Sequence, residues 1–398
     1  MKVLQINSVC GIRSTGRICT DIAEVLEQNG HECRIAYGRE TVPEKYEKYA
    51  VRISDDLHVK LDGIKTRIFD NAGFNSANTT RRFLEWVKEY DPDIIHLHNL
   101  HGYYIHIGLL FDFLKKSGKP VVWTLHDCWA FTGHCPHFDY AGCDKWKTQC
   151  FDCKLTREYP TSLLFDRSRK NYAGKSNAFC SVDNLHLVPV SEWIAKQKAE
   201  SFLKSKPHTV IHNGIDLDRF KPTESAFREK HGIGSKRMYL GVASAWGTKK
   251  GLDAFVEISG MLHDDEIIVL VGLSDKQLVM LPKNIIGIKR TNSIEELAGI
   301  YSAADVFLNP TLEEALGLVN IEALACGVPV VTYKTGGSPE CITEQSGIVV
   351  PRGDAFALLN AARSVSLSKE QIVQDAKRFD KNKKYTEYLD FYERCMCW

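Results

Sequence analysis

The stretch VFLNPTLEEALGLVNIEALACGVPVVTYKTGGSPE, residues 306–340, carries the clearest structural pattern in the chain. Its apolar start, Val306 to Leu308, ends at an Asn-Pro pair and predicts a buried strand followed by a loop. A helix is predicted over Leu318 to Cys326, because Gly-Val-Pro follows it as a stop signal. Val330 to Tyr333 predicts the next strand. Together they predict a parallel βαβ unit, whose ligands bind at the carboxyl ends of the strands.

Two carboxylates in this stretch, Glu314 and Glu322, stand eight positions apart. The amides near Gly317 and Leu318 open the predicted helix and suit an anion such as a diphosphate. Glu322, one turn further, can accept two hydrogen bonds from the vicinal diol of a ribose, and Glu314 in the loop can reach a sugar beyond the phosphates. This spacing fits a nucleoside-diphosphate-sugar. The alternative is a pair of solvated charges that complement the helix dipole.

The run EALGLVNIEA, Glu314 to Ala323, followed by GVPVV and a Gly-Gly turn, resembles the E-x7-E signature of glycosyltransferase family 4. The resemblance covers most of the chain. It implies an α/β GT-B fold, in which two Rossmann-like domains with parallel sheets face a cleft and a C-terminal helix returns to the first domain. It also implies transfer of a sugar from a nucleotide donor with retention of anomeric configuration.

The composition is that of an ordinary globular protein, with 398 residues, 44% hydrophobic and 25% charged. A net charge of +1 gives no field that would favour nucleic acid. The longest apolar run, Ile267 to Leu273, is far shorter than the roughly 18 residues of a spanning helix. The opening MKVLQINSV reads as a strand without a signal-peptide layout, so a cytoplasmic location is expected.

Three segments are predicted from these patterns. Residues 1–203 form an acceptor-side Rossmann-like domain, and residues 204–376 form the domain that binds the nucleotide-sugar. Residues 377–398 form a helix that packs back on the first domain, as the resemblance implies. The run Ser-Lys-Pro at 205–207 marks the crossing between the domains.

The N-terminal strand, Lys2 to Asn7, precedes a glycine-containing loop over Cys10 to Arg17 and a helix predicted to begin at Ile18. This order is a mononucleotide-fold opening, although the loop lacks G-x-G-x-x-G. The resemblance implies that the loop contacts the donor phosphates or the acceptor, which makes Gly16 and Arg17 candidates. The alternative is a plain turn with a solvated arginine.

A histidine, His126, directly follows the predicted strand Val121 to Leu125, at the end where ligands bind. The resemblance implies that this histidine meets the donor sugar, so it is a candidate catalytic residue together with Glu314. His98 and His101 close the preceding strand and could line the acceptor side. A structural role is the alternative for each histidine.

A cysteine-rich insertion, residues 128–153, follows this histidine. Without a secretory signal, its thiols are expected to be reduced or to bind metal. The C-x-x-C pair has the spacing of half a zinc site, and two further thiols could complete a tetrahedral structural site. The proposed ligands are Cys135, Cys143, Cys150 and Cys153. His134 and His137 are alternative ligands, and free thiols or redox chemistry are alternative roles.

The loop SAWGTKKG, after the predicted strand Met238 to Ala243, places Lys250 just before a glycine at a helix start. There its ammonium can reach a phosphate. The resemblance implies an arginine about five residues earlier, where this chain has Ala245, so Lys249 is a candidate substitute for that charge. The alternative is an exposed lysine pair.

No side chain is marked as a covalent nucleophile, and the resemblance implies front-face attack without a catalytic metal. Backbone readout of the base leaves UDP and GDP sugars both open as donors. The resemblance implies a saccharide or lipid-linked saccharide acceptor in bacterial polysaccharide synthesis. Basic residues on helices predicted over Val59 to Asn71 and Thr79 to Glu89 permit contact with the inner membrane surface, or form solvated faces. A sugar-nucleotide epimerase and a non-catalytic nucleotide-sugar binding protein are the competing functions.

Overall fold

Six short apolar runs in the first part of the chain form one parallel sheet in the order β3-β2-β1-β4-β5-β6. The strands are Lys2–Asn7 (β1), Glu32–Tyr37 (β2), Ala50–Arg52 (β3), Ile94–Leu97 (β4), Val121–Leu125 (β5) and Leu185–Pro189 (β6). Strands β4 and β5 are buried along their whole length. Such continuous burial requires helices on both faces of the sheet.

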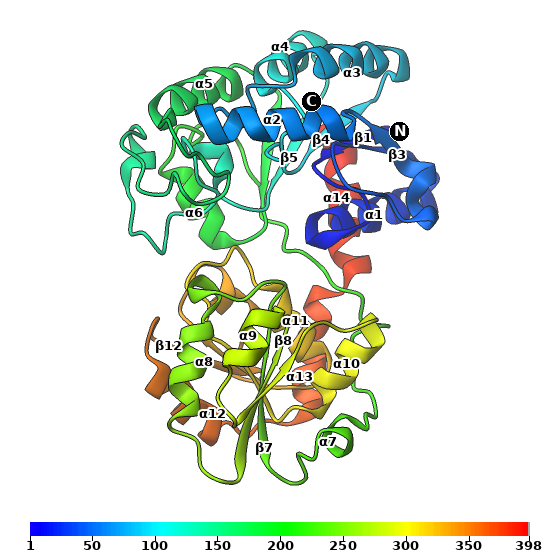
Figure 1. Cartoon of the computed structure of the whole chain (residues 1–398). Coiled ribbons are helices and arrows are strands. Elements are labelled where there is room, and N and C mark those ends of the chain that lie inside the picture. The colour runs from blue at the N-terminus through cyan, green and yellow to red at the C-terminus, as the bar shows by residue number, and fades with distance from the viewer. Residues whose placement is uncertain (397–398) are drawn as a thin grey trace. The chain divides into compact units, whose positions relative to one another are not determined.

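This computed structural model describes residues 1–396 (Figure 1). The chain divides into two compact units, the first containing Met1–His212 and the chain from Lys384 onward, and the second Asn213–Lys383. The chain thus passes from the first unit to the second after His212 and returns after Lys383. In the described residues, no helix combines the length and the apolar character needed to cross a membrane.

Helices cover both faces of the first sheet (Figure 1). Ile18, Ile22 and Leu26 of α1 pack in one core with strand residues, and the last helix of the chain, α14, joins that core. Aromatic side chains of α4, β5 and α5 contact one another on the other face. The helices of this unit are Arg13–Gln28 (α1), Asp56–Phe69 (α2), Ala77–Tyr90 (α3), Ile107–Ser117 (α4), Ser168–Cys180 (α5), Glu192–Ala199 (α6) and most of Lys381–Cys395 (α14).

Two fully buried tyrosines anchor α14 to the first sheet. The Tyr388 hydroxyl lies 2.9 Å from Thr124 Oγ1 on β5, and the Tyr392 hydroxyl lies 2.6 Å from His96 Nδ1 on β4. His96 Nε2 in turn lies 2.8 Å from Thr124 Oγ1, which closes a buried polar network. The return of the final helix to the first unit, expected from the resemblance, is confirmed.

Helix α1 begins earlier than the sequence predicts. It starts at Arg13 and not at Ile18, because Gly11 makes the turn at φ 71° and Ile12 is already the extended cap residue. Gly16 therefore lies inside the first turns of the helix and not in a loop. Its missing side chain matters there, since a Cβ would stand 3.1 Å from Val9 Cγ2 and 3.2 Å from the Gly11 nitrogen.

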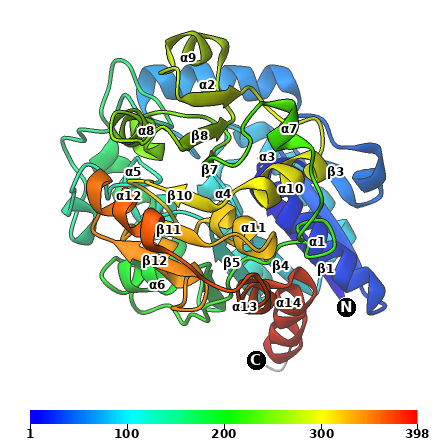
Figure 2. The same cartoon turned by 90° about the horizontal axis from the view of Figure 1, so that it is seen from below.

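The second unit repeats the same topology, with the order β12-β11-β10-β7-β8-β9, all parallel (Figure 2). Its strands are Arg237–Val242 (β7), Glu266–Val271 (β8), Ile285–Ile288 (β9), Val306–Asn309 (β10), Val330–Tyr333 (β11) and Gly347–Val350 (β12). Its helices are Phe227–Lys230 (α7), Leu252–Ser259 (α8), Asp275–Met280 (α9), Ile294–Ala303 (α10), Leu318–Ala325 (α11), Ala355–Ser364 (α12) and Lys369–Ala376 (α13).

In the second unit, helices α8 and α12 lie on one face of the sheet, and α10, α11 and α13 lie on the other (Figure 2). In each sheet the first strand of the unit lies between its second and its fourth strand. The chain therefore reverses its winding beside that first strand, between β1 and β4 in one unit and between β7 and β10 in the other. Ligands of open α/β sheets bind at such switch points.

Candidate active site

Two lysine–glutamate ion pairs lie at the switch point of the second unit. The loop after β7 carries both lysines and the loop after β10 carries both glutamates, and these two strands are neighbours. Lys250 Nζ lies 2.8 Å from Glu314 Oε2, and Lys249 Nζ lies 3.0 Å from Glu313 Oε2. The Glu314 side chain is only 18% exposed, whereas that of Lys250 is 42% exposed. The ammonium of Lys250 is therefore the more accessible charge of its pair.

The two loops are held together by their backbones. The Leu312 amide donates to the Lys249 carbonyl oxygen at 2.8 Å. Gly251 has φ 80°, and a Cβ there would stand 2.3 Å from the Pro310 carbonyl oxygen. A glycine is required where the two backbones approach this closely. This close approach positions Lys250 beside Glu314.

Glu322 lies one turn into α11, as predicted. The helix begins at Leu318 after Gly317, which has φ 97°. A carboxylate oxygen of Glu322 accepts a hydrogen bond from the Tyr301 hydroxyl at 2.9 Å. Burial and the Glu322 charge raise the pKa of Tyr301 well above its ordinary value, so the hydroxyl remains a donor. Tyr301 was not foreseen from the sequence, because it lies on α10, twenty-one residues earlier.

A tight turn between β11 and the following 3-10 turn packs directly on the Glu314 loop. A Cβ on Gly336 would stand 1.7 Å from the Glu314 carbonyl oxygen, and the Gly337 amide donates to that oxygen at 3.3 Å. The hydroxyls of Thr335 and Ser338 are buried here without a partner among residues 1–396. Ser338 Oγ lies 3.3 Å from the position of a Cβ on Gly317. These hydroxyls, missed in the sequence analysis, add polar groups at the start of α11.

In the first unit, three side chains form a chain of hydrogen bonds that ends at His126. Gln5 Nε2 donates to the Cys19 carbonyl oxygen at 2.8 Å, so Gln5 Oε1 accepts from His98 Nε2 at 2.9 Å. His98 Nδ1 is then the acceptor for the Nε2–H of His126, at 3.0 Å. This sequence of donors fixes the tautomer of His126 and leaves Nδ1 as its acceptor atom.

A second imidazole pairs with the residue after His126. His101 Nε2 lies 2.8 Å from Asp127 Oδ2, and His101 Nδ1 lies 3.1 Å from the Tyr159 hydroxyl. Burial alone would raise the pKa of Asp127, but the charge and hydrogen bond of His101 lower it to about 2. His98, His101, His126 and Asp127 line one small cavity at the ends of β4 and β5. The structure thus brings the predicted histidines together.

Burial makes the stability of this unit sensitive to acid. It lowers the pKa of His126 from 6.5 to about 4, and lowers the pKa values of His96 and His98 well below 6.5. The folded state therefore favours the neutral imidazoles. Their contribution is present in full above pH 6.5 and is lost as the pH falls toward 4, because the unfolded chain binds the protons first.

We expect the free energy of unfolding to fall by up to about 1.4 kcal/mol per pH unit for each of these histidines in that window. Urea unfolding of the full chain at pH 7, 6 and 5 measures the slope. His126→Asn should show a shallower slope than the unsubstituted chain. Equal slopes in both proteins would contradict the assignment.

Arg17, the candidate phosphate ligand of the first unit, is exposed on α1. Its Nε donates to the Arg13 carbonyl oxygen at 3.2 Å, and Arg13 itself pairs with Glu40 at 2.7 Å. Gly16 is buried beside it. The guanidinium of Arg17 is exposed in the first turns of α1 and is accessible to an anion.

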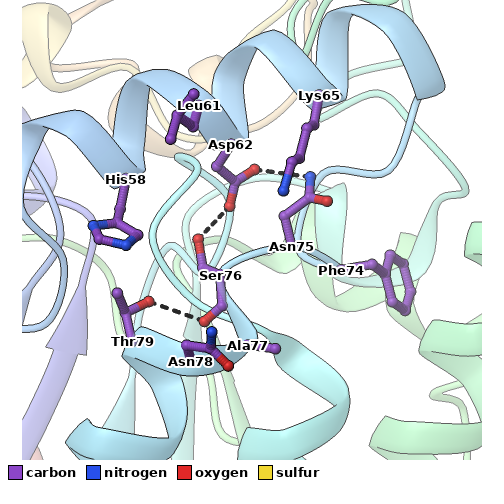
Figure 3. Close-up of a pocket in the computed structure, with 10 residues that line it drawn as sticks. All are labelled: His58, Leu61, Asp62, Lys65, Phe74, Asn75, Ser76, Ala77, Asn78 and Thr79. Atoms are coloured by element: carbon purple, nitrogen blue, oxygen red, sulfur yellow. Dashed lines mark hydrogen bonds between the residues drawn. The ribbon is translucent and has the colours of Figure 1, made fainter.

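A hollow with a volume of about 330 Å³ lies between α2 and the segment that leads into α3 (Figure 3). The buried Asp62 accepts hydrogen bonds there from Ser76 Oγ at 2.5 Å, Asn75 Nδ2 at 3.0 Å and Thr66 Oγ1 at 3.3 Å. These three bonds join α2 to the segment that leads into α3.

The predicted zinc ligands meet in a different cavity of the first unit, which Cys135, Cys143, Cys150 and Cys153 all line. None of the cysteines among residues 1–396 forms a disulfide. In the same residues, no group of three or more His, Cys, Asp or Glu side chains already has a metal-binding arrangement. The four residues are thus gathered, but their sulfur atoms are not arranged as a finished metal site.

Comparison with known proteins identifies the family. Residues 15–219 match the profile described as Glycosyltransferase Family 4, and residues 236–366 match Glycosyl transferases group 1. The chain is 23% identical over 394 residues to the putative colanic acid biosynthesis glycosyl transferase WcaC of Escherichia coli K12, covering 94% of this chain and 92% of WcaC.

Two solved structures share the fold. Sucrose-phosphate synthase from Thermosynechococcus elongatus matches with a TM-score of 0.73 and 17% identity over 100% of this chain and 99% of its own. Anabaena Alr3699/HepE, solved with UDP-glucose, matches with a TM-score of 0.65 and 15% identity over 98% and 99%. Both sheets have the topology of GT-B glycosyltransferases. The chain belongs to glycosyltransferase family 4 and is a glycosyltransferase enzyme.

Proposed function

We propose that the enzyme transfers a sugar from a nucleoside-diphosphate-sugar to a saccharide or lipid-linked saccharide, with retention of anomeric configuration. The observation that carries this proposal is the Lys250–Glu314 pair at the β7–β10 switch point, with Glu322 one turn into the adjacent helix. The cation and the helix N-terminus match the phosphates of such a donor. Of the two carboxylates, Glu314 matches the hexose and Glu322 the ribose.

Each residue has a distinct role in this proposal. Lys250 and the amides of Gly317 and Leu318 neutralise the leaving diphosphate, Glu322 accepts hydrogen bonds from the ribose diol, and Glu314 binds hydroxyls of the hexose. His126 contacts the donor sugar through Nδ1, the acceptor atom left by its bond to His98. Gly16 and Arg17 supply a further contact with the donor phosphates or the acceptor.

The reaction breaks the bond between the anomeric carbon and the diphosphate oxygen. The acceptor hydroxyl attacks from the same face, forms the new glycosidic bond and passes its proton to the leaving diphosphate. The protein positions the two substrates and stabilises the charge that develops on the diphosphate. No step needs a metal ion, and no carboxylate acts as a covalent nucleophile.

The nucleotide of Alr3699/HepE is UDP, and WcaC is named for colanic acid biosynthesis. These names support a UDP- or GDP-sugar as donor and an acceptor that belongs to a bacterial surface polysaccharide. The deciding experiment is a thermal-shift panel of UDP-, GDP- and ADP-sugars, followed by a transfer assay with the sugar that stabilises the protein most. Conversion of that donor in the absence of any acceptor would favour an epimerase instead, and binding without turnover would favour a non-catalytic protein.

Glu322→Ala should weaken binding of the nucleotide by about 1 to 3 kcal/mol, because the ribose hydroxyls lose their acceptor. Isothermal titration with the nucleoside diphosphate measures the change. Glu295→Ala is the matched control, since Glu295 begins α10 and is exposed in a pair with Arg219. Equal affinities of the Glu322→Ala variant and the unsubstituted enzyme would refute the ribose assignment.

The location proposed for the enzyme is the cytoplasm, with peripheral contact at the inner membrane surface. Helix α2 presents Leu57, Leu61 and Ile64 along one side, with exposed fractions of 63%, 45% and 51%. Lys60 directly precedes Leu61 in the sequence, and Lys65 directly follows Ile64. An exposed apolar stripe flanked by cations suits an anionic lipid surface.

Leu57→Ser/Leu61→Ser should reduce cosedimentation with phosphatidylglycerol-containing vesicles by at least about tenfold, because the loss of two buried leucines weakens binding by more than about 1.4 kcal/mol. Val279→Ser/Met280→Ser, which removes exposed apolar side chains of the second unit, is the control. Equal sedimentation of both variants would contradict the membrane contact.

A further inference from the structure

The loop between β5 and α5 concentrates thiols in a segment with little regular structure. Its only helical turns are the three-residue 3-10 segments Trp129–Phe131 and Lys145–Lys147. Four cysteines, spread over nineteen residues, line one cavity in it together with His134 and Trp146. A loop of this kind is held by side-chain packing or by a cross-link, and its cysteines form no disulfide.

The strongest sign of a missing partner is His134. Its Nδ1 lies 2.5 Å from Asp70 Oδ1, and the two side chains are 0% and 1% exposed. Its Nε2 lies at the cavity that the thiols line, is fully buried and has no partner among residues 1–396. A buried nitrogen without a partner is unfavourable, because it has lost its hydrogen bonds to water. An imidazole held by a carboxylate on one nitrogen is typical of metal sites.

Burial raises the pKa of the Cys150 thiol to about 11, but two neighbouring groups complement negative charge on sulfur. The Gly133 amide donates to Cys150 Sγ at 3.2 Å. The buried ammonium of Lys175 donates to the carbonyl oxygens of Trp129 and Thr132, at 2.8 and 3.1 Å, in the same loop. A zinc ion with four thiolates has a net negative charge, and backbone amides and a buried cation complement that charge.

We propose that Cys135, Cys143, Cys150 and Cys153 bind one zinc ion in a tetrahedral structural site beside the buried Asp70–His134 pair. Binding forms four zinc–sulfur bonds and releases the four thiol protons to solvent. Zinc–sulfur bonds are about 2.3 Å long, so the thiol side chains must move toward the ion when it binds. Four thiolates leave no open position, so the ion stabilises the loop and takes no part in transfer.

This site has a consequence for the candidate active site. The cysteine-rich insertion, residues 128–153, begins directly after Asp127, and Tyr159, which bonds His101, follows the last cysteine by six residues. An ion bound between these points fixes both ends of the segment that carries the Asp127 and Tyr159 side chains. Metal binding therefore acts as a folding constraint on the histidine cluster at the ends of β4 and β5.

The experiment is metal analysis of the full chain purified under reducing conditions from zinc-supplemented cells. We expect about one zinc ion per chain, and less than about a tenth of that in Cys150→Ser/Cys153→Ser. Cys180→Ser is the matched control, because Cys180 lies on α5, where its thiol contacts the Phe202 carbonyl oxygen at 3.4 Å. It should retain the ion. Full zinc content in the double variant, or none in the unsubstituted chain, would overturn the proposal.

A second measurement needs no cysteine variant to fold. Exchange of the unsubstituted protein with cobalt should produce intense sulfur-to-cobalt charge-transfer bands and the visible bands of a tetrahedral site. His134→Gln should keep the ion but lose it faster to a competing chelator. Octahedral cobalt spectra would overturn the thiolate site, and complete loss of zinc from His134→Gln would overturn the four-thiolate ligand set.

Discussion

Lys250→Ala is expected to lower kcat/KM for sugar transfer on the order of 10²- to 10³-fold, the effect of removing one preorganised charge from a developing oxyanion. The Lys250 ammonium lies 2.8 Å from Glu314 at the switch point and is 42% exposed, so it can bind a phosphate as well as its carboxylate partner. Initial rates of transfer over a range of donor concentrations measure the change.

The control for this variant is Lys289→Ala. Lys289 pairs with Asp275 at the same distance, 2.8 Å, but its side chain is 61% exposed and lies outside the switch point. Its removal should leave kcat/KM unchanged. A similar loss in both variants, or no loss in Lys250→Ala, would contradict the role assigned to Lys250. Lys250→Arg should recover part of the activity, because the positive charge is retained.

Gly336→Ala is expected to destabilise the second unit by about 3 to 5 kcal/mol, at the upper end of the range for single substitutions. The new Cβ would stand 1.7 Å from the Glu314 carbonyl oxygen and 2.8 Å from its carbonyl carbon, and φ is 52°. Both neighbours are backbone atoms, so no side chain can turn aside to relieve the clash. Thermal and urea unfolding of the full chain measure the loss.

Gly353→Ala separates the steric clash from the backbone strain. Gly353 has φ 83°, which, like the φ of Gly336, is unfavourable for alanine. A Cβ on Gly353, however, would meet nothing within 4 Å. Its replacement should therefore destabilise by only about 1 to 2 kcal/mol. Equal losses in the two variants would show that the Gly336 turn is not packed against the Glu314 loop.

Local patterns predicted the elements of the second unit well. The strand Val330–Tyr333 has the predicted bounds, and α11 begins at the predicted Leu318. Both are set by short-range signals, an apolar run or a glycine next to a helix start. The start of α1 was missed because the sequence has no such short-range signal there. Ile12 caps it without a side-chain hydrogen bond, so no Ser, Thr, Asp or Asn marks the position.

The partners of the candidate site residues could not be predicted, because they depend on which strands are neighbours. The Lys250–Glu314 pair spans 64 residues and exists because β7 and β10 are adjacent. The Gln5–His98–His126 chain likewise depends on the order of β1, β4 and β5. Gln5 was overlooked although a buried polar residue within an apolar strand is a detectable signal.

The anchoring of α14 sets an order of events during synthesis. Tyr388, Tyr392 and other residues of α14 complete a core whose remaining members lie between Val3 and Ile211, so the first sheet lacks part of its packing until α14 has left the ribosome. The second unit, contained within Asn213–Lys383, emerges entirely before that moment. Translation thus supplies the whole second unit before α14 is available, and the first unit, although encoded earlier, completes its core only afterwards.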